Sequence, residues 1–533
     1  MTTAQFPIPE RLRPMLAPES DLQALAERFD AVGRELYLVG GSVRDAVLNR
    51  PSTDVDLTTD ARPDEILELV RPWADTIWTQ GQRFGTIGAR RGDLHVEITT
   101  FRDEVYHADS RKPEVTFSDD IYTDLSRRDF TVNAMALRLG QLELIDPHGG
   151  IDDLVAGKLT TPLSADVSFT DDPLRMLRAA RFIAQLGLTP DDELIRSVEE
   201  QRHRMSIVSA ERIQIELAKL LVAPGVEQAL WFLCDTGLSD EFLPELNAMR
   251  LEQDPIHRHK DVLAHTIAVV GKTPPRLRVR LAALFHDIAK PQTRSITDEG
   301  VSFHFHDVVG GRMTRERMKE LRFPTELTKE VVRLVRLHLR FHTYKMGWSD
   351  RAVRRYVRDA GPLLEDLNDL VRSDCTTRNK AKAQKLARRM DELEERITEL
   401  EKAEALAAIK PPLDGLEVMT FLDLPPGPLV GKALGFLLDL RLDVGPMTTA
   451  EAFDRLREWA LQQDVAAAGG TVPDDEGLRN AKAAVRERQK ASAVTPSEPD
   501  QPEQTQLGRG EADEIRPDIA LESQASADAE LPE

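Results

Sequence analysis

The sequence predicts an α+β fold, in which an N-terminal α/β head is followed by an all-α body. Short β-branched runs such as LYLVG, FGTIGA and LHVEITTF occur only before about residue 150, where they alternate with helical patterns. From about residue 170 to about residue 465, apolar residues recur at the 3.6-residue period of helices, interrupted by KTPP, RFPT and DLPPGPLVG. The last forty residues are rich in Pro, Glu, Gln, Ser and Ala, which favours disorder.

Composition excludes several classes of protein. The N-terminus, MTTAQFPIPERLRPML, has no apolar core of signal-peptide length, and no later stretch approaches the ~20 apolar residues of a membrane span. We therefore expect a soluble, cytoplasmic protein with no membrane partner. Cys234 and Cys375 are the only cysteines, so any metal must be held by oxygen and imidazole.

The net charge must be judged by region. A formal charge of -21 argues against a nucleic-acid partner, but residues 491–533 contain 11 acidic and 2 basic residues and so account for -9 of it. The rest of the chain is closer to neutral, which leaves a nucleic-acid partner open.

Two aspartates in STDVDLTT form a candidate metal site. Asp54 and Asp56 flank a valine in a β-prone run, so both side chains leave the same face of a strand. Paired hard oxygen ligands suit Mg²⁺; the alternative is an acidic strand end or turn. Glu97, in the middle of LHVEITTF, is the candidate third carboxylate, unless it is a satisfied or edge-facing glutamate.

A glycine turn lies just before this strand. In LVGGSVRD, Gly40 and Gly41 follow a strand and lead into a helix, so backbone N–H groups can approach a phosphate there. Arg44, near the first turn of that helix, is placed to clamp a phosphate. Together with the aspartates, this predicts a nucleoside triphosphate on the glycine turn, with metals that activate an attacking hydroxyl and neutralise the leaving pyrophosphate.

Four segments carry a family resemblance: LVGGSVRD…DVDL, RRDFTVNAMA (127–136), DPHGGIDDL (146–154) and DDPLRMLRAARF (171–182). In order and spacing they resemble the motifs of the class II CCA-adding tRNA nucleotidyltransferases of the polymerase β superfamily. The resemblance covers roughly residues 35–250. It implies a polymerase β-like nucleotidyltransferase head that adds C, C and A to the 3′ end of tRNA from CTP and ATP, with Mg²⁺ and without a nucleic-acid template.

The resemblance also implies roles for RRDFTVNAMA. Arg127 and Arg128 would contact phosphates, Asp129 would accept a hydrogen bond from a ribose hydroxyl, and Asn133 would support the loop. The alternative is an ordinary helix start capped by Asp129.

The segment DDPLRMLRAARF has the spacing of one helix face, since Asp172, Arg175, Arg178 and Arg181 recur every three residues. The resemblance implies a protein template: Asp172 and Arg175 would pair with the amino donor and ring-nitrogen acceptor that cytosine and adenine share. Arg178 and Arg181 would reach phosphate or hold the helix. An amphipathic surface helix is the alternative. Similar proteins usually have Glu at the position of Asp171.

A second metal site is expected among the histidines. His265, His286, Asp287 and Asp374 match the ligand order H…HD…D and resemble the HD phosphohydrolase domain appended to some CCA-adding enzymes. Imidazole with carboxylate suits Mn²⁺, Ni²⁺, Fe²⁺ or Mg²⁺ acting on a phosphate ester. His306 and His338 would make the centre binuclear. The alternative is an RNA-holding scaffold.

Basic residues in helices over about 327–390 either follow an RNA backbone or form a solvated face.

The predicted order of domains follows from these segments: a nucleotidyltransferase head (1–160), a helical base-recognition neck (161–255), an HD-type helical domain (256–400), a C-terminal helical RNA-binding region (401–470) and a mostly disordered acidic tail (471–533).

Three alternative functions remain. A poly(A) polymerase or an A-only adding enzyme shares the motifs, and a flexible loop over about 102–124 would decide between them. An HD-type RNA or nucleotide phosphohydrolase, or a non-catalytic RNA chaperone, is disfavoured by the intact Asp54, Asp56 and Arg44.

Overall fold

A computed structural model describes residues 16–50, 54–107, 110–251, 261–297, 300–341, 348–375, 380–404, 410–445 and 447–494. The chain divides into two compact units, one comprising residues up to 410 with 442–446, and the other residues 411–441 with those from 447 onward. None of the helices in these ranges is both long and apolar enough to cross a membrane.

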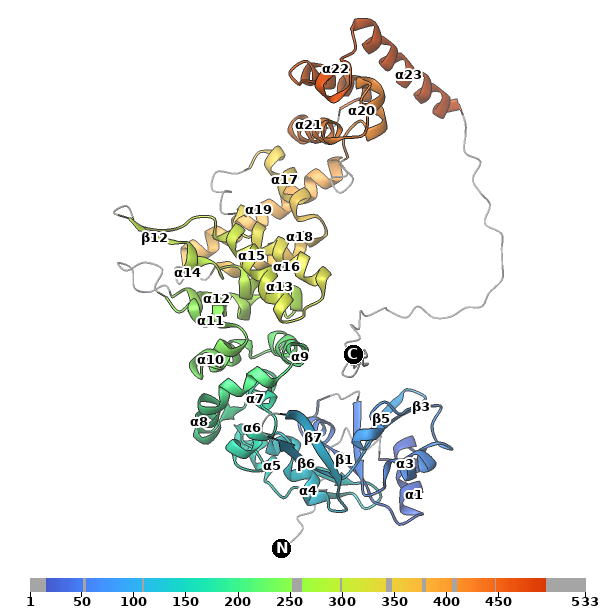
Figure 1. Ribbon diagram of the computed structural model, residues 1–533, viewed down its shortest axis with the longest axis vertical. Helices are drawn as coiled ribbons and strands as arrows, with labels where there is room; N and C mark the ends of the chain where they lie inside the picture. The colour runs from blue at the N-terminus through green and yellow to red at the C-terminus, as the bar shows by residue number, and fades with distance from the viewer. Residues whose placement is uncertain are drawn as a thin grey trace, which may run out of the picture. The chain divides into compact units, whose positions relative to one another are not determined.

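The N-terminal region contains a mixed sheet, of which β1, β3 and β5 are labelled in Figure 1. Its strand order is β3-β4-β5-β2-β1-β8-β9. Only β2 and β5 pair in parallel; the other neighbours are antiparallel. This confirms the predicted α/β head. The strands are β1 (Leu36–Val39), β2 (Asp54–Thr59), β3 (Thr76–Trp78), β4 (Thr86–Arg91), β5 (Leu94–Thr100), β8 (Ala136–Arg138) and β9 (Glu143–Ile145).

Helices cover both faces of this sheet near β1. All four residues of β1 are buried: Leu36 and Leu38 pack with α1 and α3, whereas Tyr37 and Val39 pack with Leu125 of α4. The period-2 alternation of a strand explains this division. The helices of this region are α1 (Asp21–Asp30), α2 (Gly41–Val47), α3 (Pro63–Val70), α4 (Ile121–Ser126) and α5 (Gly150–Ala156).

The segment expected as a flexible loop over about 102–124 contains paired strands instead. Strands β6 (Arg102–His107) and β7 (Ser110–Phe117) form an antiparallel hairpin, with a register shift between Val105 and His107. Val105 and Tyr106 in one arm, and Val115, Thr116 and Phe117 in the other, are β-branched or aromatic, which favours strand pairing over an open loop.

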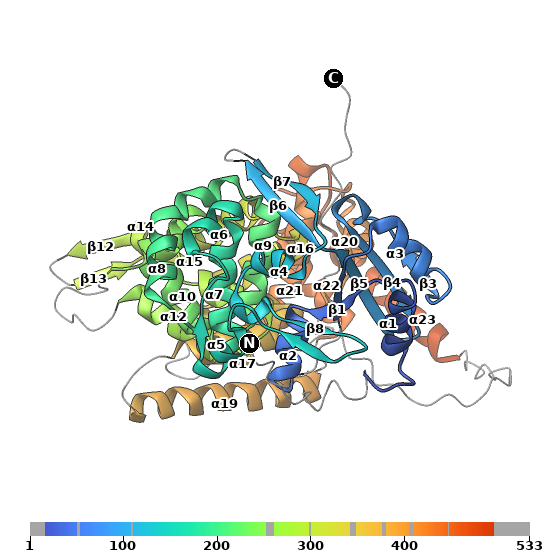
Figure 2. The same ribbon diagram turned by 90° about the horizontal axis from the view of Figure 1, so that it is seen from below.

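The body is helical, as predicted, and α19 is seen side-on in Figure 2. Its helices are α6 (Ala165–Asp171), α7 (Leu174–Leu186), α8 (Asp192–Gln201), α9 (Ala210–Leu221), α10 (Val226–Asp235), α11 (Pro244–Ala248), α12 (Val262–Lys272), α13 (Leu277–Phe285), α14 (Lys290–Thr293), α15 (His306–Glu320), α16 (Thr325–Leu337), α17 (Asp350–Ala360), α18 (Leu364–Asp374) and α19 (Lys380–Glu404).

Two short sheets interrupt this helical body, so the expectation that strands occur only before about residue 150 is wrong. Strands β10 (Lys158–Leu159) and β11 (Thr189–Pro190) pair in parallel. Strands β12 (Arg294–Thr297) and β13 (Gly300–Phe303) form an antiparallel hairpin. The sequence carries a hairpin signal here, because the β-prone segments RSIT and GVSF are separated by only two residues, Asp-Glu, and the second segment begins with Gly.

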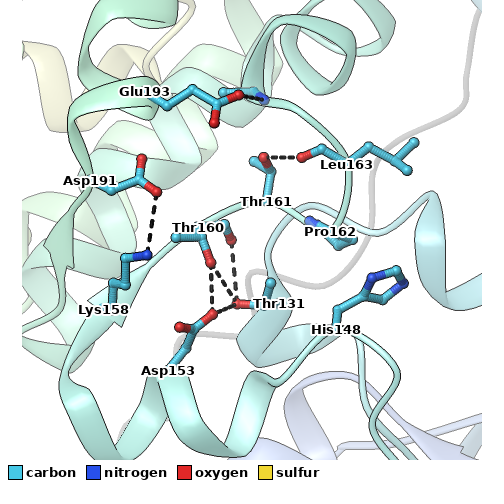
Figure 3. A pocket seen from close by; sticks show the side chains of 11 residues that line it. Thr131, His148, Asp153, Lys158, Thr160, Thr161, Pro162, Leu163, Asp191 and Glu193 are labelled. Carbon is cyan, nitrogen blue, oxygen red and sulfur yellow. Dashed lines mark hydrogen bonds and ion pairs between the residues drawn. The ribbon is translucent and has the colours of Figure 1, made fainter.

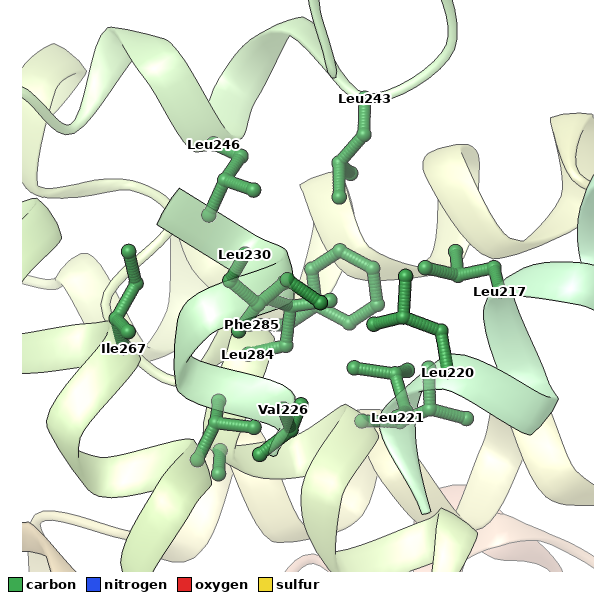
Figure 4. Packing of buried hydrophobic residues seen from close by; sticks show 14 of the residues in the cluster. Leu217, Leu220, Leu221, Val226, Leu230, Leu243, Leu246, Ile267, Leu284 and Phe285 are labelled. Carbon is green, nitrogen blue, oxygen red and sulfur yellow. The ribbon is translucent and has the colours of Figure 1, made fainter. Parts of the chain in front are cut away.

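One hydrophobic core extends across the boundary expected near residue 255. Leu217, Leu220 and Leu221 of α9 lie around Leu284 and Phe285 of α13, and all five are essentially fully buried (Figure 4). His286 follows Phe285 directly in the chain. Packing against α9 therefore fixes the backbone from which the HD-type histidine extends.

The second unit holds a separate core that includes Leu422, Leu437 and Leu456. Two of its helices begin with capping boxes, at Asp414 and at Thr448. The helices from this part of the chain are α20 (Gly415–Leu422), α21 (Pro428–Val444), α22 (Thr449–Ala460) and α23 (Asp475–Val494). The predicted tail thus includes α23, and its remainder from residue 495 lies outside the described residues.

Candidate functional site

The parallel pairing of β2 and β5 sets the candidate metal carboxylates side by side. Asp56 is the register partner of Glu97, and Asp54 is that of His95. Asp56 and Glu97 are exposed, whereas Val96 and Ile98 are buried. Strands in a sheet lie about 4.8 Å apart, so the two carboxylates have the chemistry and proximity to share a divalent cation. The side chain of Asp54 lies outside the described residues.

A glycine is required at the turn before α2. Gly40 has φ +65° and ψ -131°, and a Cβ placed on it would lie 3.0 Å from an NH1 atom of Arg128. Both the conformation and the close approach disfavour any side chain. In α2, the Ser42 hydroxyl accepts a hydrogen bond from the backbone N–H of Asp56 at 3.2 Å. The glycine turn is therefore tied directly to the carboxylate strand.

Asn133 connects Arg44 to Asp129. Its amide oxygen accepts from Arg44 NH1 at 2.6 Å, and its amide nitrogen donates to Asp129 Oδ1 at 2.9 Å. Residues 131–133 form a 3₁₀ turn that leads into β8, so the alternative of an ordinary helix start at Asp129 is not observed. Arg44 also bonds Asp45 through Nε and NH2, each at 2.8 Å. These bonds hold the loop in place, as expected for Asn133.

Asp124 holds both arginines of this loop and was missed in the sequence. One of its oxygens accepts from Arg127 NH2 at 2.6 Å, and the other accepts from Arg128 NH2 at 3.0 Å. Asp124 is fully buried. Burial alone would raise the pKa of this carboxyl, but the two guanidinium charges outweigh it and lower the pKa. The D-x-x-R-R spacing, one turn of helix, was the available signal.

Asp172 does not lie on the helix that carries the three arginines. Helix α6 ends at Asp171, Asp172 is extended with φ -135° and ψ 101°, and α7 begins at Leu174 after Pro173. Proline lacks an N–H and is tolerated only at a helix start. The expectation of one continuous helical row from Asp172 to Arg181 is therefore wrong at its first member.

Arg175 and Asp172 have different partners. Arg175 is buried; its NH2 donates to the backbone carbonyl of Arg127 at 2.6 Å and its NH1 to Ser168 Oγ at 2.9 Å. Asp172 Oδ2 accepts from Arg212 NH2 at 2.8 Å. Arg175 thus joins α7 to the loop of Arg127, and the guanidinium beside Asp172 is that of Arg212.

The other two arginines of the row, Arg178 and Arg181, form ion pairs with carboxylates. Arg178 NH2 lies 2.7 Å from Asp129 Oδ2, and Arg181 Nε lies 2.5 Å from Glu216 Oε2. Burial alone would raise the pKa of Asp129, but the Arg178 charge and the Asn133 hydrogen bond outweigh it, so the pKa is lowered. Asp129 is therefore ionised at neutral pH and is already paired within the protein.

A polar cavity of about 320 Å³ lies behind the same loop (Figure 3). Asp153 Oδ2 accepts hydrogen bonds there from the hydroxyls of Thr131, at 2.6 Å, and Thr160, at 2.7 Å. Lys158 lies 3.7 Å from Asp191 across the cavity. These bonds anchor Thr131, which follows Asp129 closely in the chain, so the cavity walls support the loop.

The six residues of the predicted second metal site converge. His265 Nε2 lies 2.9 Å from Asp374 Oδ1 and 3.3 Å from His286 Nε2. On the other side, Asp287, His306 and His338 form a second group whose potential ligand atoms lie within 4.8 Å of one another. Helices α12, α13, α15, α16 and α18 supply or directly precede these residues. The two sets could each hold one ion.

The imidazoles are oriented for metal binding. His286, His306 and His338 each place Nδ1 within 2.6–2.8 Å of the backbone carbonyl three residues earlier. An Nδ1–H donated to a carbonyl leaves the Nε2 lone pair for a metal. In the described part of the chain, the Nε2 atoms of His306 and His338 are buried and have no hydrogen-bond partner. These orphaned acceptors fit a divalent cation.

The electrostatics of this cluster have opposing effects on metal binding. Burial alone would lower the pKa of His286, but the carboxylates of Asp287 and Asp374 outweigh it and raise the pKa, so this ring must release a proton when a metal binds. Burial and the neighbouring His286 lower the pKa of His338 to about 4, so its ring is neutral at pH 7. Lys290 Nζ lies 2.6 Å from Asp287 Oδ2. Burial alone would raise the pKa of Asp287, but the charges and hydrogen bonds of His286 and Lys290 lower it, so it offers an ionised carboxylate.

Part of the expected basic RNA face is used inside the fold. Arg354 is buried and donates to the carbonyl of Leu442 at 3.1 Å. Arg333 donates to the carbonyl of Asp359 at 2.8 Å, and Arg340 pairs with the Asp359 carboxylate at 3.1 Å. For these three arginines the contacts favour a structural role.

Three family models match the chain in order. The Poly A polymerase head domain matches residues 36–160, the probable RNA and SrmB-binding site of polymerase A matches residues 187–250, and the HD domain matches residues 262–401.

Solved CCA-adding enzymes share the fold. The Bacillus stearothermophilus CCA-adding enzyme in complex with CTP superposes with a TM-score of 0.60 at 21% identity, covering 84% of this chain and all of that one. The Thermotoga maritima CCA-adding enzyme complexed with tRNA superposes with a TM-score of 0.54 at 18% identity, covering 87% of this chain and all of that one.

Relatives in sequence fall into two groups. CCA-adding enzymes of Lactobacillus gasseri and of a Geobacillus species are each 40% identical to this chain in the aligned region. That region covers 40% and 42% of this chain, and 53% and 54% of the two relatives, so this chain spans about half of their length. The A-adding tRNA nucleotidyltransferase of Deinococcus radiodurans is 33% identical over 442 residues, covering 79% of this chain and 95% of that protein. This chain therefore belongs to the tRNA nucleotidyltransferase family, with a polymerase A-type head and an HD domain.

Proposed function

We propose that this protein adds C, C and A to the 3′ end of tRNA from CTP and ATP, without a nucleic-acid template. The observation that carries the proposal is the parallel register that sets Asp56 beside Glu97, next to the turn at Gly40. Exposed paired carboxylates beside a bare backbone turn suit transfer of a nucleotide from a triphosphate.

Different residues are assigned to phosphate binding and to Mg²⁺ binding. The turn at Gly40 and Gly41 admits the triphosphate, and Arg44, Arg127 and Arg128 contribute cationic donors to its phosphates. Asp54 and Asp56, with Glu97, would hold Mg²⁺, which lowers the pKa of the attacking 3′-hydroxyl and neutralises the leaving pyrophosphate. The protein's part is to hold the reacting oxygens in line and to exclude water.

Base selection is assigned to the α6–α7 junction. Asp172 offers a carboxylate acceptor for the exocyclic amino group of cytosine or adenine, and Arg175 offers a donor for the ring nitrogen beside it. Because Arg175 is bonded to the carbonyl of Arg127, its use as a base reader requires that it exchange this bond for one to the nucleotide. Arg178 and Arg181 hold α7 through Asp129 and Glu216.

Addition of A alone is the second candidate. The observation that favours it is the match to the Deinococcus radiodurans A-adding enzyme, which extends over 79% of this chain, whereas the CCA-adding relatives align with 40% and 42% of it.

One assay separates these candidates. The protein is incubated with tRNAs that end before C74, before C75 or before A76, with each nucleoside triphosphate singly and with CTP and ATP together, and products are resolved to one nucleotide. Extension of all three substrates to a complete CCA end supports CCA addition. Extension only of tRNA that already ends in C75, with ATP only, establishes the A-adding candidate.

A second activity is proposed for the HD domain, namely metal-dependent hydrolysis of a phosphate ester. The observation that favours it is the pair of ligand groups built from His265, His286 and Asp374 and from Asp287, His306 and His338. The imidazole and carboxylate donors suit Mn²⁺, Ni²⁺, Fe²⁺ or Mg²⁺. A bound ion would polarise the phosphate and supply the attacking hydroxide.

A further inference from the structure

Both oxygens of the Asp172 carboxylate are engaged by the protein. Oδ1 accepts from the backbone N–H of Leu174 at 3.1 Å, at the start of α7. Oδ2 accepts from Arg212 NH2 at 2.8 Å. A carboxylate has about four lone-pair sites, so each oxygen still has capacity for one further donor. The orientation of the group is set by one backbone bond and one charged bond.

The helix that carries Arg212 is held firmly. Ile213 and Leu217 of α9 are buried in the body core, and Glu216, one turn after Arg212, pairs with Arg181 of α7. Two ion pairs therefore join α9 to the α6–α7 segment. The side chain of Arg212 is 37% exposed, against 15% for that of Asp172, so the pair borders solvent and a nucleotide can reach it.

We propose that Arg212 is a positioning residue for base selection, which holds the Asp172 carboxylate fixed toward the incoming base. The inference rests on the proposed function, since it assumes that Asp172 accepts the amino group shared by cytosine and adenine. Arg212 acts on selectivity through Asp172 and does not itself read the base.

The physical reason is the geometry of a singly tethered carboxylate. Without Arg212, the Asp172 carboxylate keeps only the hydrogen bond from the backbone N–H of Leu174 to Oδ1. The carboxylate can then rotate about the Cβ–Cγ bond, and Oδ2 can accept from water instead. A mobile acceptor gives less preference for an amino group and less rejection of the carbonyl that uracil and guanine present at the same edge. The loss therefore falls on CTP and ATP together.

The test measures kcat/KM for all four nucleoside triphosphates with the full chain carrying Arg212→Ala. We expect kcat/KM for CTP and ATP to fall about 10-fold relative to UTP and GTP, the size of one charge-assisted hydrogen bond. Arg212→Lys, which can still donate to Asp172, should recover part of the preference. Direct titration of CTP and UTP into the protein should show the same change in relative affinity without turnover.

Arg204→Ala is the matched control. Arg204 NH2 donates to the backbone carbonyl of Thr170 at 2.9 Å, so it ties down the same end of α6 without touching the Asp172 carboxylate. This variant should lose stability with no change in the order of nucleotides. If Arg212→Ala behaves like Arg204→Ala, with all four nucleotides reduced equally, Arg212 is only structural and the inference is overturned.

A double-mutant cycle separates a positioning role from direct contact. In an Asp172→Ala background, Arg212→Ala should cause no further change in preference, because the group that it positions is gone. A further change of equal size in that background would mean that Arg212 meets the base itself, which also overturns the inference. If the parent protein shows no preference for CTP and ATP at all, the proposed function fails, and this is seen before any variant is compared.

Discussion

The amide oxygen of Asn133 accepts a hydrogen bond from the guanidinium of Arg44 at 2.6 Å, although the two residues lie 89 positions apart in the chain. The amide nitrogen of the same side chain donates to Asp129 at 2.9 Å. A single amide therefore fixes α2, which we propose binds phosphate, relative to the loop that carries Asp129.

Asn133→Ala should lower kcat/KM for all nucleotides about 10- to 100-fold, because a small misplacement of phosphate-binding groups is costly. The order of the four nucleotides should stay the same, since neither Arg44 nor Asp129 meets the base. Steady-state kinetics with each triphosphate checks this. Asn247→Ala serves as the control, because Asn247 bonds the carbonyl of Cys234 and Asp240 in the neck. A change of nucleotide order in Asn133→Ala would contradict the assignment.

Asp56→Ala should reduce nucleotide addition at least about 1000-fold, because the lost group is a proposed Mg²⁺ ligand. The melting temperature should stay constant or rise, since the variant relieves like-charge repulsion with Glu97. Asp93→Ala removes another exposed carboxylate, in the turn between β4 and β5, and should leave addition unchanged. Residual activity of more than a few per cent of the parent in Asp56→Ala would rule out its role as a metal ligand.

Asp124→Asn should destabilise the protein by about 3–5 kcal/mol at neutral pH, because two guanidinium groups lose their buried partner. The pKa of Asp124 is lowered in the folded state. Its stabilisation is therefore fully present above the unfolded pKa of about 3.9 and is lost as the pH falls below that value toward the folded pKa.

Urea unfolding of the parent and of Asp124→Asn at several pH values measures this dependence. The difference in the free energy of unfolding should be constant down to about pH 5 and should shrink below about pH 4. Asp119→Asn is the control, because Asp119 pairs with Arg62 while its side chain is 78% exposed. A difference that does not vary with pH would show that Asp124 stabilises the fold without being ionised.

His338→Gln should halve the metal content of the HD domain. Both proteins also carry Asp56→Ala, which removes a proposed metal ligand of the head, so that the metal content reports on the HD domain. The protein with His338 intact is expected to retain two Mn²⁺ per chain, and the protein with His338→Gln is expected to retain one. Elemental analysis after gel filtration gives the stoichiometry. Equal metal content in both proteins would contradict a binuclear centre.

The paired variant His286→Ala, Asp287→Ala should abolish phosphate release from 2′,3′-cyclic and 3′-phosphorylated nucleotides with Mn²⁺, Ni²⁺ or Mg²⁺. Nucleotide addition to tRNA should persist, because the carboxylates and the glycine turn to which it is assigned all belong to the N-terminal sheet and helix α2. If the parent protein releases no phosphate with any of these metals, the domain is better explained as an RNA-holding scaffold.

The sequence predicted the groups that depend on local patterns. The glycine turn and the strand of Asp54 and Asp56 follow from short-range spacing, whereas the HD ligands, which lie between positions 265 and 374, came from the resemblance to a known domain. The choice of Glu97 rested only on its position in a strand, and the parallel register with Asp56 agrees with it. Helical periodicity likewise predicted the body, because burial on one face leaves a clear 3.6-residue pattern.

What could not be predicted was the choice of partners. The spacing of Asp172 and Arg175 suggested that they act side by side, but Pro173 breaks the helix between them, and the guanidinium beside Asp172 comes from Arg212, 40 positions away. Many arginines in the sequence have equal charge and reach, so only the tertiary packing of α9 selects this one. The hairpin β12–β13 could not be predicted from periodicity, because its strands have four residues each and lie between longer stretches with a helical pattern.

The three imidazoles that donate Nδ1–H to carbonyls of their own chain have a consequence for how the HD domain responds to metal supply. Their rings are held by the backbone of α13, Phe303 and α16, so binding a metal would not require these rings to reorient. A centre of this kind would lose its ions to a chelator and regain them without refolding. If the proposed centre forms, metal availability rather than the folding equilibrium would set how much of it is loaded.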